Sequence, residues 1–350
     1  MYESIRQNPD IWSKFIGKDE DLMMHSSVDS FFDYDRCQLS DVLSPEVSRS
    51  LIDSGFEVVL PEEKKFAVCL THDVDDIYPP LPHTLLSVLH SVKGANLGQL
   101  KKHALWRLNG KNSSPYLNFR EIMDIEESYG AKSSFYFLTA EKDPRRFRYN
   151  IEDAESYMGE IVDRGCEVGL HGGYFSYASY DKLAEEKQKL ENVLGKKVIG
   201  FRNHYLRFKM TDSWEILSKA GFRYDSTLGF NNAVGFRNGL CHPFRPFDVG
   251  GSKELDILEI PLVAMDAALF NCTASFKDAW ELIKGILDTG EQYNGIITLL
   301  WHNSSFSTPF RKDWKNLYIK ILDYCNQKNA WITSGEDIYR WWNNTYINYP

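Results

Sequence analysis

The sequence predicts an α/β protein, a distorted barrel of the (β/α)7 type with an N-terminal appendage. Two observations predict this fold class. From residue 64 onward, apolar runs of strand length alternate with amphipathic stretches of helix length about seven or eight times. This alternation is typical of parallel strands joined by crossover helices, and so many units favour a barrel over an open sheet. The 350 residues, 43% of them hydrophobic, also suffice for one large core.

The predicted strands are mostly continuous apolar runs, which indicate burial on both faces as in a parallel sheet. In chain order they span 65–71, 132–138, 166–171, 197–202, 222–226, 257–263, 295–302 and 330–334. The predicted helices are amphipathic stretches, several of which end at a glycine. They span 116–130, 150–165, 179–195, 211–221, 276–290, 312–327 and the stretch from Gly335 onward.

Periodicity also divides the chain. Residues 1–63 have weak periodicity, so we interpret them as an appendage of unknown role. Residues 64–350 form the predicted barrel, and residues 82–115 interrupt it as an irregular, partly helical insertion.

The composition excludes some partners. A net charge of −9 disfavours nucleic acid and docking on anionic lipid, because both need a basic surface. There is no apolar run of about 18 residues and no signal-peptide pattern at the N-terminus, so we expect a cytoplasmic protein without a membrane span. The six cysteines lie far apart and are expected to be reduced. The oligomeric state is not indicated.

Titratable side chains follow several predicted strands where each strand ends. They are His72, Asp73, Asp75, His171, Arg202, Asp266 and His302. In parallel barrels the carboxyl ends of the strands form the rim that carries the active site. Any one of these residues alone could be a helix cap, a surface ion pair or a hydrogen-bonded loop residue. Together they predict one site at the rim.

The stretch CLTHDVDDI, from Cys69 to Ile77, indicates the chemistry. Adjacent carboxylates behind a buried strand repel one another unless a metal ion, an arginine or a shared proton lies among them. Carboxylate with imidazole suits zinc, with cobalt, manganese or nickel as alternatives. One of Asp73 and Asp75 could ligate the ion while the other accepts a proton from water. A histidine from another strand could protonate a leaving group, as in metal-assisted hydrolysis of amides or esters.

Four motifs in order resemble the polysaccharide deacetylase superfamily, the NodB-homology hydrolases that include carbohydrate esterase family 4. LTHDVD (70–75) resembles the first motif in its DxD variant, and EVGLHGGYFS (167–176) resembles the second. GFRNHY (200–205) is similar to the third and LLWH (299–302) to the last. The resemblance covers residues 64–340 and implies a distorted barrel with one divalent metal ion.

The resemblance also implies roles for five rim residues. Asp73 would be the general base, and Asp75 and His171 would ligate the metal. Arg202 would hold Asp73 through an ion pair, and His302 would be the general acid for the leaving amine.

Further contacts with substrate are expected from five residues. The resemblance implies that the backbone N–H of Tyr205 donates to the oxyanion and that Leu300 lines a pocket for the acyl methyl group. His72, where the family has an aromatic residue, is a candidate substrate contact. Tyr174 and Trp301 lie near the motifs and could stack on sugar rings, although each could instead pack beneath a loop.

One departure concerns the metal. The second motif usually has another histidine four residues after the first, and here that residue is Phe175. His204 is the first candidate for the missing ligand, although it could instead contact the acyl group or a neighbouring loop. Asp266 is the second candidate, and it could instead orient His302.

The sequence therefore predicts a metal-dependent hydrolase that removes an N-acyl group, first of all acetyl, from a sugar or a surface-polysaccharide precursor. Two alternatives remain. One is a hydrolase of C–N bonds in a non-sugar amide, resembling allantoinases. The other is a degenerate barrel that binds glycan without turnover.

Overall fold

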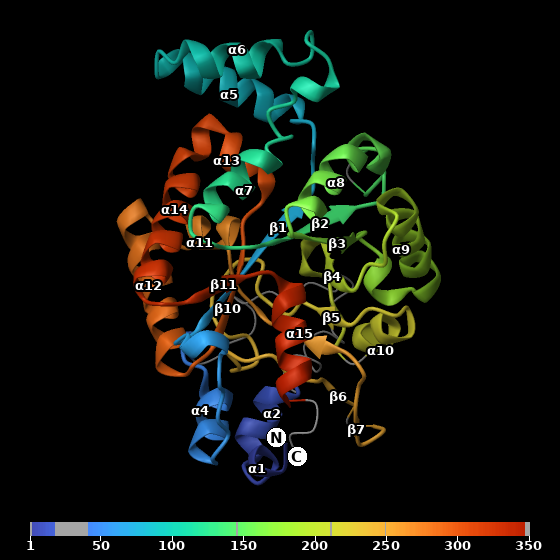
Figure 1. Cartoon of the computed structure of the whole chain (residues 1–350), viewed down its shortest axis with the longest axis vertical. Helices are drawn as coiled ribbons and strands as arrows, with labels where there is room; N and C mark the ends of the chain where they lie inside the picture. Colours follow the sequence, from blue (N-terminus) through green and yellow to red (C-terminus); the bar gives the residue numbers. More distant parts are fainter. Residues whose placement is uncertain (1, 18–40, 145, 211, 249, 347–350) are drawn as a thin grey trace.

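A nine-stranded, curled sheet forms the centre of the structure, a computed structural model that describes residues 2–17, 41–144, 146–210, 212–248 and 250–346 (Figure 1). Every strand pairing in this sheet is parallel, and the strand order is β8-β5-β4-β3-β2-β1-β10-β9, with β11 beside β1. Its strands are β1 (Ala67–Val74), β2 (Ser134–Leu138), β3 (Glu167–Gly172), β4 (Gly200–Asn203), β5 (Tyr224–Asp225), β8 (Leu258–Glu259), β9 (Leu262–Met265), β10 (Ile296–Leu300) and β11 (Trp331–Thr333).

Helices surround this sheet on its outer side (Figure 1). Those of the barrel are α7 (Phe119–Glu127), α8 (Glu155–Asp163), α9 (Tyr180–Leu194), α10 (Asp212–Lys219), α11 (Asp266–Asn271), α12 (Phe276–Gln292), α13 (Asn303–Ser307), α14 (Lys312–Gln327) and α15 (Gly335–Tyr346). The short 3₁₀ helices are η1 (Pro61–Glu63), η2 (Lys111–Ser113), η3 (Ile151–Ala154), η4 (Ser176–Ala178), η5 (His204–Leu206) and η6 (Pro309–Arg311). A separate antiparallel pair joins β6 (Phe247–Asp248) to β7 (Lys253–Glu254).

The sheet curls until its two end strands are neighbours in the chain. β8 ends at Glu259 and β9 begins at Leu262, so only Ile260 and Pro261 separate the two ends of the strand order. The predicted strand 257–263 is thus two strands, and Pro261, which has no N–H to donate, lies between them. The predicted α/β fold, a distorted barrel, is confirmed.

The strand β1 is an inner strand of the barrel sheet, with neighbours on both sides. Its first half pairs with β10 and β11 on its two sides, and its second half, from Thr71 to Val74, pairs with β2. All eight residues of β1 are buried. The continuous apolar run that predicted this strand therefore reflects burial by neighbours on every side, and β1 ends within the rim at Asp73 and Val74.

The predicted insertion is helical over much of its length. Residues 82–115, predicted to be irregular and partly helical, contain most of α5 (Leu81–Lys93) and all of α6 (Leu97–Leu105). These two helices form a hairpin that projects beyond the barrel at the top of Figure 1. None of the helices in the described part of the chain is both long and apolar enough to cross a membrane.

The described residues of the N-terminal segment pack against the opposite end of the barrel. The helices are α1 (Tyr2–Arg6), α2 (Pro9–Phe15) and α4 (Glu46–Asp53), and residues 18–40 lie outside the described residues. Phe15 contacts Phe244 with ring centroids 5.3 Å apart, and Val47 N–H donates to the Gly239 carbonyl over 3.0 Å. These contacts join the segment to the core of the barrel, and the boundary at residue 63 stays a prediction.

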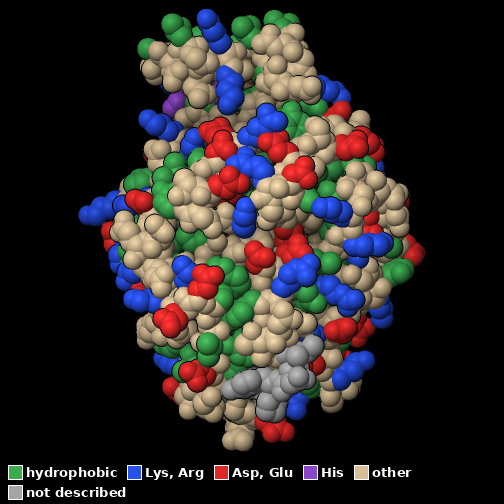
Figure 2. Space-filling view, viewed as in Figure 1, with side chains coloured by type: hydrophobic (Ala, Val, Ile, Leu, Met, Phe, Trp, Pro, Cys, Tyr) green, Lys and Arg blue, Asp and Glu red, His purple; other side chains and the backbone are tan. Residues whose placement is uncertain are grey.

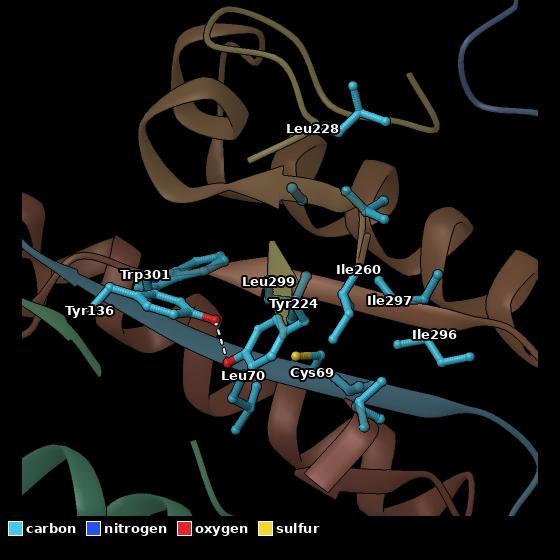
Figure 3. Packing of buried hydrophobic residues seen from close by; sticks show 14 of the residues in the cluster. Cys69, Leu70, Tyr136, Tyr224, Leu228, Ile260, Ile296, Ile297, Leu299 and Trp301 are labelled. Carbon is cyan, nitrogen blue, oxygen red and sulfur yellow. Dashed lines mark hydrogen bonds between the residues drawn. The ribbon is translucent and has the colours of Figure 1, made fainter. Parts of the chain in front are cut away.

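Two tyrosines fill the lower interior of the barrel. Tyr136 on β2 and Tyr224 on β5 are hydrogen-bonded through their hydroxyls over 2.9 Å, and Tyr224 also donates to Glu167 over 2.6 Å (Figure 3). Their rings lie against Gly169 and Gly200, where a Cβ atom would overlap the ring of Tyr136 or Tyr224, respectively. Glycine at these two strand positions is therefore a packing requirement.

We expect Gly169→Ala to destabilise the fold by about 1–3 kcal/mol, because the added methyl group overpacks the barrel interior. The matched control is Gly159→Ala on α8, where a Cβ atom meets nothing within 4 Å. Alanine should stabilise that helix by up to about 1 kcal/mol. Urea-unfolding midpoints check both variants. An unchanged midpoint for Gly169→Ala would contradict the packing described for Tyr136.

Candidate functional site

Arg202 lies beside Asp73, near the carboxyl end of β1. Its Nη1 donates to Asp73 Oδ1 over 3.1 Å and to Thr71 Oγ1 over 2.6 Å. On the other side, Nε donates to the Ser226 carbonyl and Nη2 to Ser226 Oγ, each over 2.8 Å. Burial would lower the pKa of Arg202, but the charge of Asp73 raises it above its ordinary value. Arg202 is therefore a charged partner for Asp73 inside the barrel.

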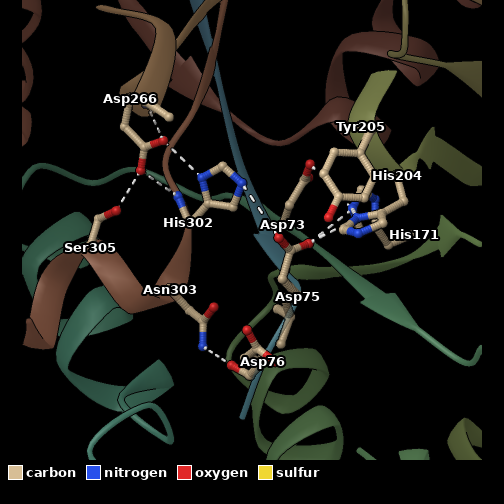
Figure 4. Close-up of polar contacts among 12 residues, drawn as sticks. Asp73, Asp75, Asp76, His171, His204, Tyr205, Asp266, His302, Asn303 and Ser305 are labelled. Atoms are coloured by element: carbon tan, nitrogen blue, oxygen red, sulfur yellow. Dashed lines mark hydrogen bonds and ion pairs between the residues drawn. The ribbon is translucent and has the colours of Figure 1, made fainter. Parts of the chain in front are cut away.

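Three side chains from three strand ends converge on one point beside this pair (Figure 4). Asp75 Oδ1 lies 3.2 Å from His171 Nε2 and 3.2 Å from His204 Nδ1, and the two nitrogens lie 3.0 Å apart. The three ligand atoms have the proximity expected of a metal site. In the described part of the chain, Asp75 Oδ1 is buried without a hydrogen bond of good geometry. One carboxylate with two imidazoles fits zinc and similar divalent ions.

The outer nitrogens of the two imidazoles define where their protons lie. His171 Nδ1 lies 3.0 Å from the Arg202 carbonyl, which can only accept, so Nδ1 carries the proton and Nε2 offers a lone pair to the centre. His204 Nε2 lies 3.0 Å from Arg148 Nη2 and 3.7 Å from Asp143 Oδ2. Because a guanidinium can only donate, Nε2 accepts from Arg148 in this geometry, and ligation through Nδ1 would need a proton on Nε2 that is directed to Asp143 instead. Metal-binding histidines commonly have such a carboxylate partner.

The charges around the centre shift the pKa values of its members. Burial would raise the pKa of Asp75, but the positive charge of a protonated His204 and the closeness of both imidazoles lower it well below its ordinary value. Burial would lower the pKa of His204, but the charge of Asp75 and the hydrogen bond to Asp143 raise it. The site therefore favours positive charge beside the Asp75 carboxylate, as the clustered aspartates of the sequence required.

His302 faces the centre from the opposite wall, where β10 ends. Its Nδ1 lies 2.8 Å from Asp266 Oδ1, and its Nε2 lies 4.0 Å from Asp75 Oδ2 (Figure 4). Asp266 also accepts from the backbone N–H of His302 and from Ser305 Oγ. Burial would lower the pKa of His302, but the charge of Asp266 and its hydrogen bond raise it to about 9. Asp266 thus orients His302 and holds it protonated.

Tyr205 follows His204 in an uncommon backbone conformation. It has φ 59° and Leu206 has φ 50°, a left-handed region that non-glycine residues rarely adopt and that is found at functional sites. The ring of Tyr205 lies over His204 at 4.1 Å between centroids, and its hydroxyl accepts from Arg148 over 3.2 Å. This turn brings His204 and Tyr205 to the same side of the rim.

Asp143 and Arg148 are functional candidates that the sequence reasoning missed. Both follow β2 in the stretch 139–150, and Arg148 Nε donates to Asp143 over 2.6 Å while its Nη2 contacts His204. Arg148 and Arg146 also contact Asp76. The available signal was the rule already applied to the other strands, because these charges follow the carboxyl end of a parallel strand.

A cavity of about 440 Å³ opens beside this group. Tyr174, Phe175 and Asp143 line it, together with Lys142 and Lys182. Phe175 is 52% exposed and lies in this cavity wall, so it does not occupy the metal position. His204, from the next strand end, supplies the third donor where the motif lacks its second histidine.

Three predictions are corrected by the structure. His72 is fully buried, and both of its ring nitrogens are engaged, with the Trp301 carbonyl and with Glu126, so it cannot contact substrate. Trp301 is also fully buried (Figure 3), packs against Tyr318 and donates to the Trp314 carbonyl. Asp266 is not in the metal-ligand group but contacts His302 and Ser305, in agreement with the alternative that it orients His302.

The remaining predicted residues lie around the centre. Tyr174 lines the cavity beside it. Leu300 is buried in a small apolar cluster with Leu206 and Leu262, next to the turn that carries Tyr205. Asp73 Oδ2 lies 3.6 Å from His171 Nε2. The rim thus brings together Asp73, Asp75, His171, Arg202, His204, Tyr205 and His302.

Comparisons with known proteins find relatives in structure but not in sequence. The sequence matches no protein-family model and no curated protein. A Mycobacterium smegmatis protein named as a polysaccharide deacetylase has a TM-score of 0.54 at 19% identity, covering 81% of this chain and 92% of its own. A Pseudomonas aeruginosa PAO1 protein of the same name has a TM-score of 0.53 at 13% identity, covering 84% and 97%.

The enzyme PuuE allantoinase has a TM-score of 0.55 at 14% identity, covering 90% of this chain and 99% of its own. Identities this low establish similarity of fold alone. The predicted resemblance is therefore confirmed at the level of the fold, which this chain shares with the two proteins named as polysaccharide deacetylases and with the allantoinase.

Proposed function

We propose that the protein is a metal-dependent hydrolase that removes an N-acyl group, first of all acetyl, from a sugar unit of a surface-polysaccharide precursor. The observation that carries this proposal is a group of three possible ligands with a proton acceptor and a proton donor beside it. Asp75, His171 and His204 converge on one point, Asp73 lies beside His171, and His302 lies beside Asp75.

A divalent ion, zinc first and cobalt, manganese or nickel as alternatives, would be held by Asp75, His171 and His204 and would supply the Lewis acidity that activates water and polarises an acyl carbonyl. Catalytic zinc sites normally keep three protein ligands and one open position. Three donors of the right kinds are therefore the number that such a site needs.

Asp73 and His302 would move the protons. Asp73 is the proposed base, because Arg202 donates to its Oδ1 and fixes the carboxylate at the edge of the ligand group. His302 is the proposed acid: Asp266 holds its Nδ1, so Nε2 is the atom that would donate to the leaving nitrogen. A base and an acid beside the same centre suit attack by water on an amide and protonation of the departing amine.

The acyl group would lie between the turn after β4 and the end of β10. The backbone N–H of Tyr205 is the proposed oxyanion donor, an interaction typically worth about 3–4 kcal/mol in the transition state. Leu300, with Leu206 and Leu262, would surround the acyl methyl group.

The cavity beside the centre would receive the sugar. Its volume of about 440 Å³ falls in the range of small-molecule sites, about 300–1,000 Å³. Tyr174 and Phe175 offer aromatic faces, and Lys142, Lys182 and Asp143 offer polar groups for hydroxyls. The two neighbours named as polysaccharide deacetylases favour a carbohydrate substrate.

A second candidate is a C–N hydrolase of a non-sugar amide. PuuE allantoinase has the same fold, and almost all of its length is covered by this chain. The observation that weighs against a degenerate, glycan-binding barrel is His204, which provides the third ligand group that Phe175 does not.

We expect His204→Ala to weaken zinc binding by more than about 100-fold, because losing even a hydrogen-bond partner of a ligand costs about 10–100-fold. Asp75→Asn should weaken binding similarly. Phe175→Ala is the matched control, since Phe175 lies near the centre without ligating, and it should keep the affinity of the wild type. Competition with a chelating dye measures all three. Undiminished zinc affinity in His204→Ala would remove this residue from the ligand group.

We expect Asp73→Asn and His302→Gln to bind zinc normally and to lower kcat by about 10²–10⁴-fold, because each removes a group that transfers a proton. Acetate release from acetylated amino sugars, with zinc content measured on the same samples, checks this expectation. The same assay with ureides separates the two candidate functions. Turnover of ureides without turnover of acetylated sugars would favour the allantoinase-like reaction.

A further inference from the structure

The hairpin of α5 and α6 exposes an unusual number of large apolar side chains. Of the exposed large hydrophobic residues in the described part of the chain, most lie on this one element. They are Leu81, Leu85, Leu86, Leu89, Val92, Leu97, Leu105 and Leu108. Leu97 is 70% exposed and Leu108 is 83% exposed. Clustered exposure of this kind marks an interaction surface, whereas single exposed leucines are ordinary.

The distribution of polar and apolar side chains on α5 is the reverse of that on a helix that packs against a core. Its buried residues are Ser87 and Ser91, and the Ser91 hydroxyl donates to the Ser87 carbonyl over 2.7 Å. Leu81, Leu85 and Leu89 recur every four residues, so they form one stripe that faces away from the two serines. Small polar groups thus face inward and leucines face outward.

The exposed leucines do not arise from a detached segment, because specific contacts hold the hairpin on the barrel. His83 Nδ1 lies 2.8 Å from the Tyr116 hydroxyl, and His103 Nε2 lies 3.0 Å from the Ser307 carbonyl. The rings of Trp106 and Tyr78 are stacked in parallel at 6.0 Å between centroids. The outward face is therefore part of a defined surface.

The charge of the hairpin is opposite to that of the chain. Residues 81–110 contain four basic residues, Lys93, Lys101, Lys102 and Arg107, and no aspartate or glutamate, whereas the whole chain carries −9. In Figure 2, hydrophobic and basic side chains share the upper end of the molecule, where the hairpin lies, and acidic ones begin below it. The net charge of the whole chain does not reveal that basic residues are concentrated on the hairpin.

We propose that the α5–α6 hairpin docks on an anionic membrane surface. Leucines would enter the boundary between head groups and acyl chains, and the lysines would lie at the level of the anionic head groups with their stems along the apolar layer. A second copy of the chain fits this surface less well, because two basic hairpins would repel each other. Binding without spanning agrees with the absence of a membrane-crossing helix from the described residues.

Docking of this hairpin would bring the rim close to the lipid. Leu81 begins α5 only six residues after Asp75, a stretch that spans at most about 20 Å when extended. The rim would then face substrates whose acylated sugar is carried by a lipid, an extension that rests on the proposed function. The docking itself is independent of catalysis.

Co-sedimentation with vesicles tests the docking. Vesicles of phosphatidylcholine mixed with phosphatidylglycerol should pellet the wild-type protein, and vesicles of phosphatidylcholine alone should pellet much less. The double variant Lys101→Glu/Lys102→Glu should lower binding about tenfold or more, because each basic group near an anionic surface contributes substantially. Leu85→Glu/Leu89→Glu should abolish binding, and added salt should weaken that of the wild type.

Two controls separate docking from other causes. Val59→Glu changes a residue with 61% exposure outside the hairpin and should bind vesicles like the wild type. Asp75→Asn should also bind vesicles like the wild type. Docking can therefore be judged even if the proposed catalysis is wrong. Equal pelleting of the wild type and the hairpin variants would overturn the proposal. So would a dimer in light scattering that Leu85→Glu/Leu89→Glu converts to a monomer, because the leucines would then form an interface between copies.

Discussion

The buried guanidinium of Arg202 is the interaction on which the rest of the site depends. From β4 it reaches across the barrel interior to Thr71 and Asp73 on β1, and it also holds the Ser226 segment after β5. Breaking a buried ion pair by removing one partner commonly costs about 3–5 kcal/mol. Asp73 and Arg202 therefore hold each other in place, and through them the positions of the β1 and β4 ends are coupled. The ligand group lies between these two ends.

Much of the fold could be predicted because burial leaves a direct trace in the sequence. The first half of β1, residues 67–70, reads as an apolar run, and α12 and α14 read as amphipathic helices. The hairpin was harder, since its leucines face outward and periodicity shows only that one face differs from the other. Strands of two residues, such as β5 and β8, are too short for any pattern to place their ends.

Site residues were predictable where they end a strand. They were less predictable where the role depends on the direction in which the side chain points. Asp75, His171 and His302 were placed correctly because strand ends meet at one rim. His72 and Trp301 failed because neighbouring residues on a strand point to opposite faces, and these two side chains turn outward into the helical layer. Asp143 and Arg148 follow the carboxyl end of β2, which indicates the rim, but the path of their loop depends on tertiary packing, so the sequence does not indicate their contact with His204.

Supplying the third ligand group from the turn after β4 changes which loop is tied to the metal. In this arrangement His204 would tether the segment of Tyr205, while the loop after β3, with Tyr174 and Phe175, carries no ligand beyond His171 on the strand itself. The turn after β4 would then help to hold the ion, and the loop after β3 would contact the substrate. The aromatic wall of the cavity could be redesigned for new substrates without rebuilding the metal centre.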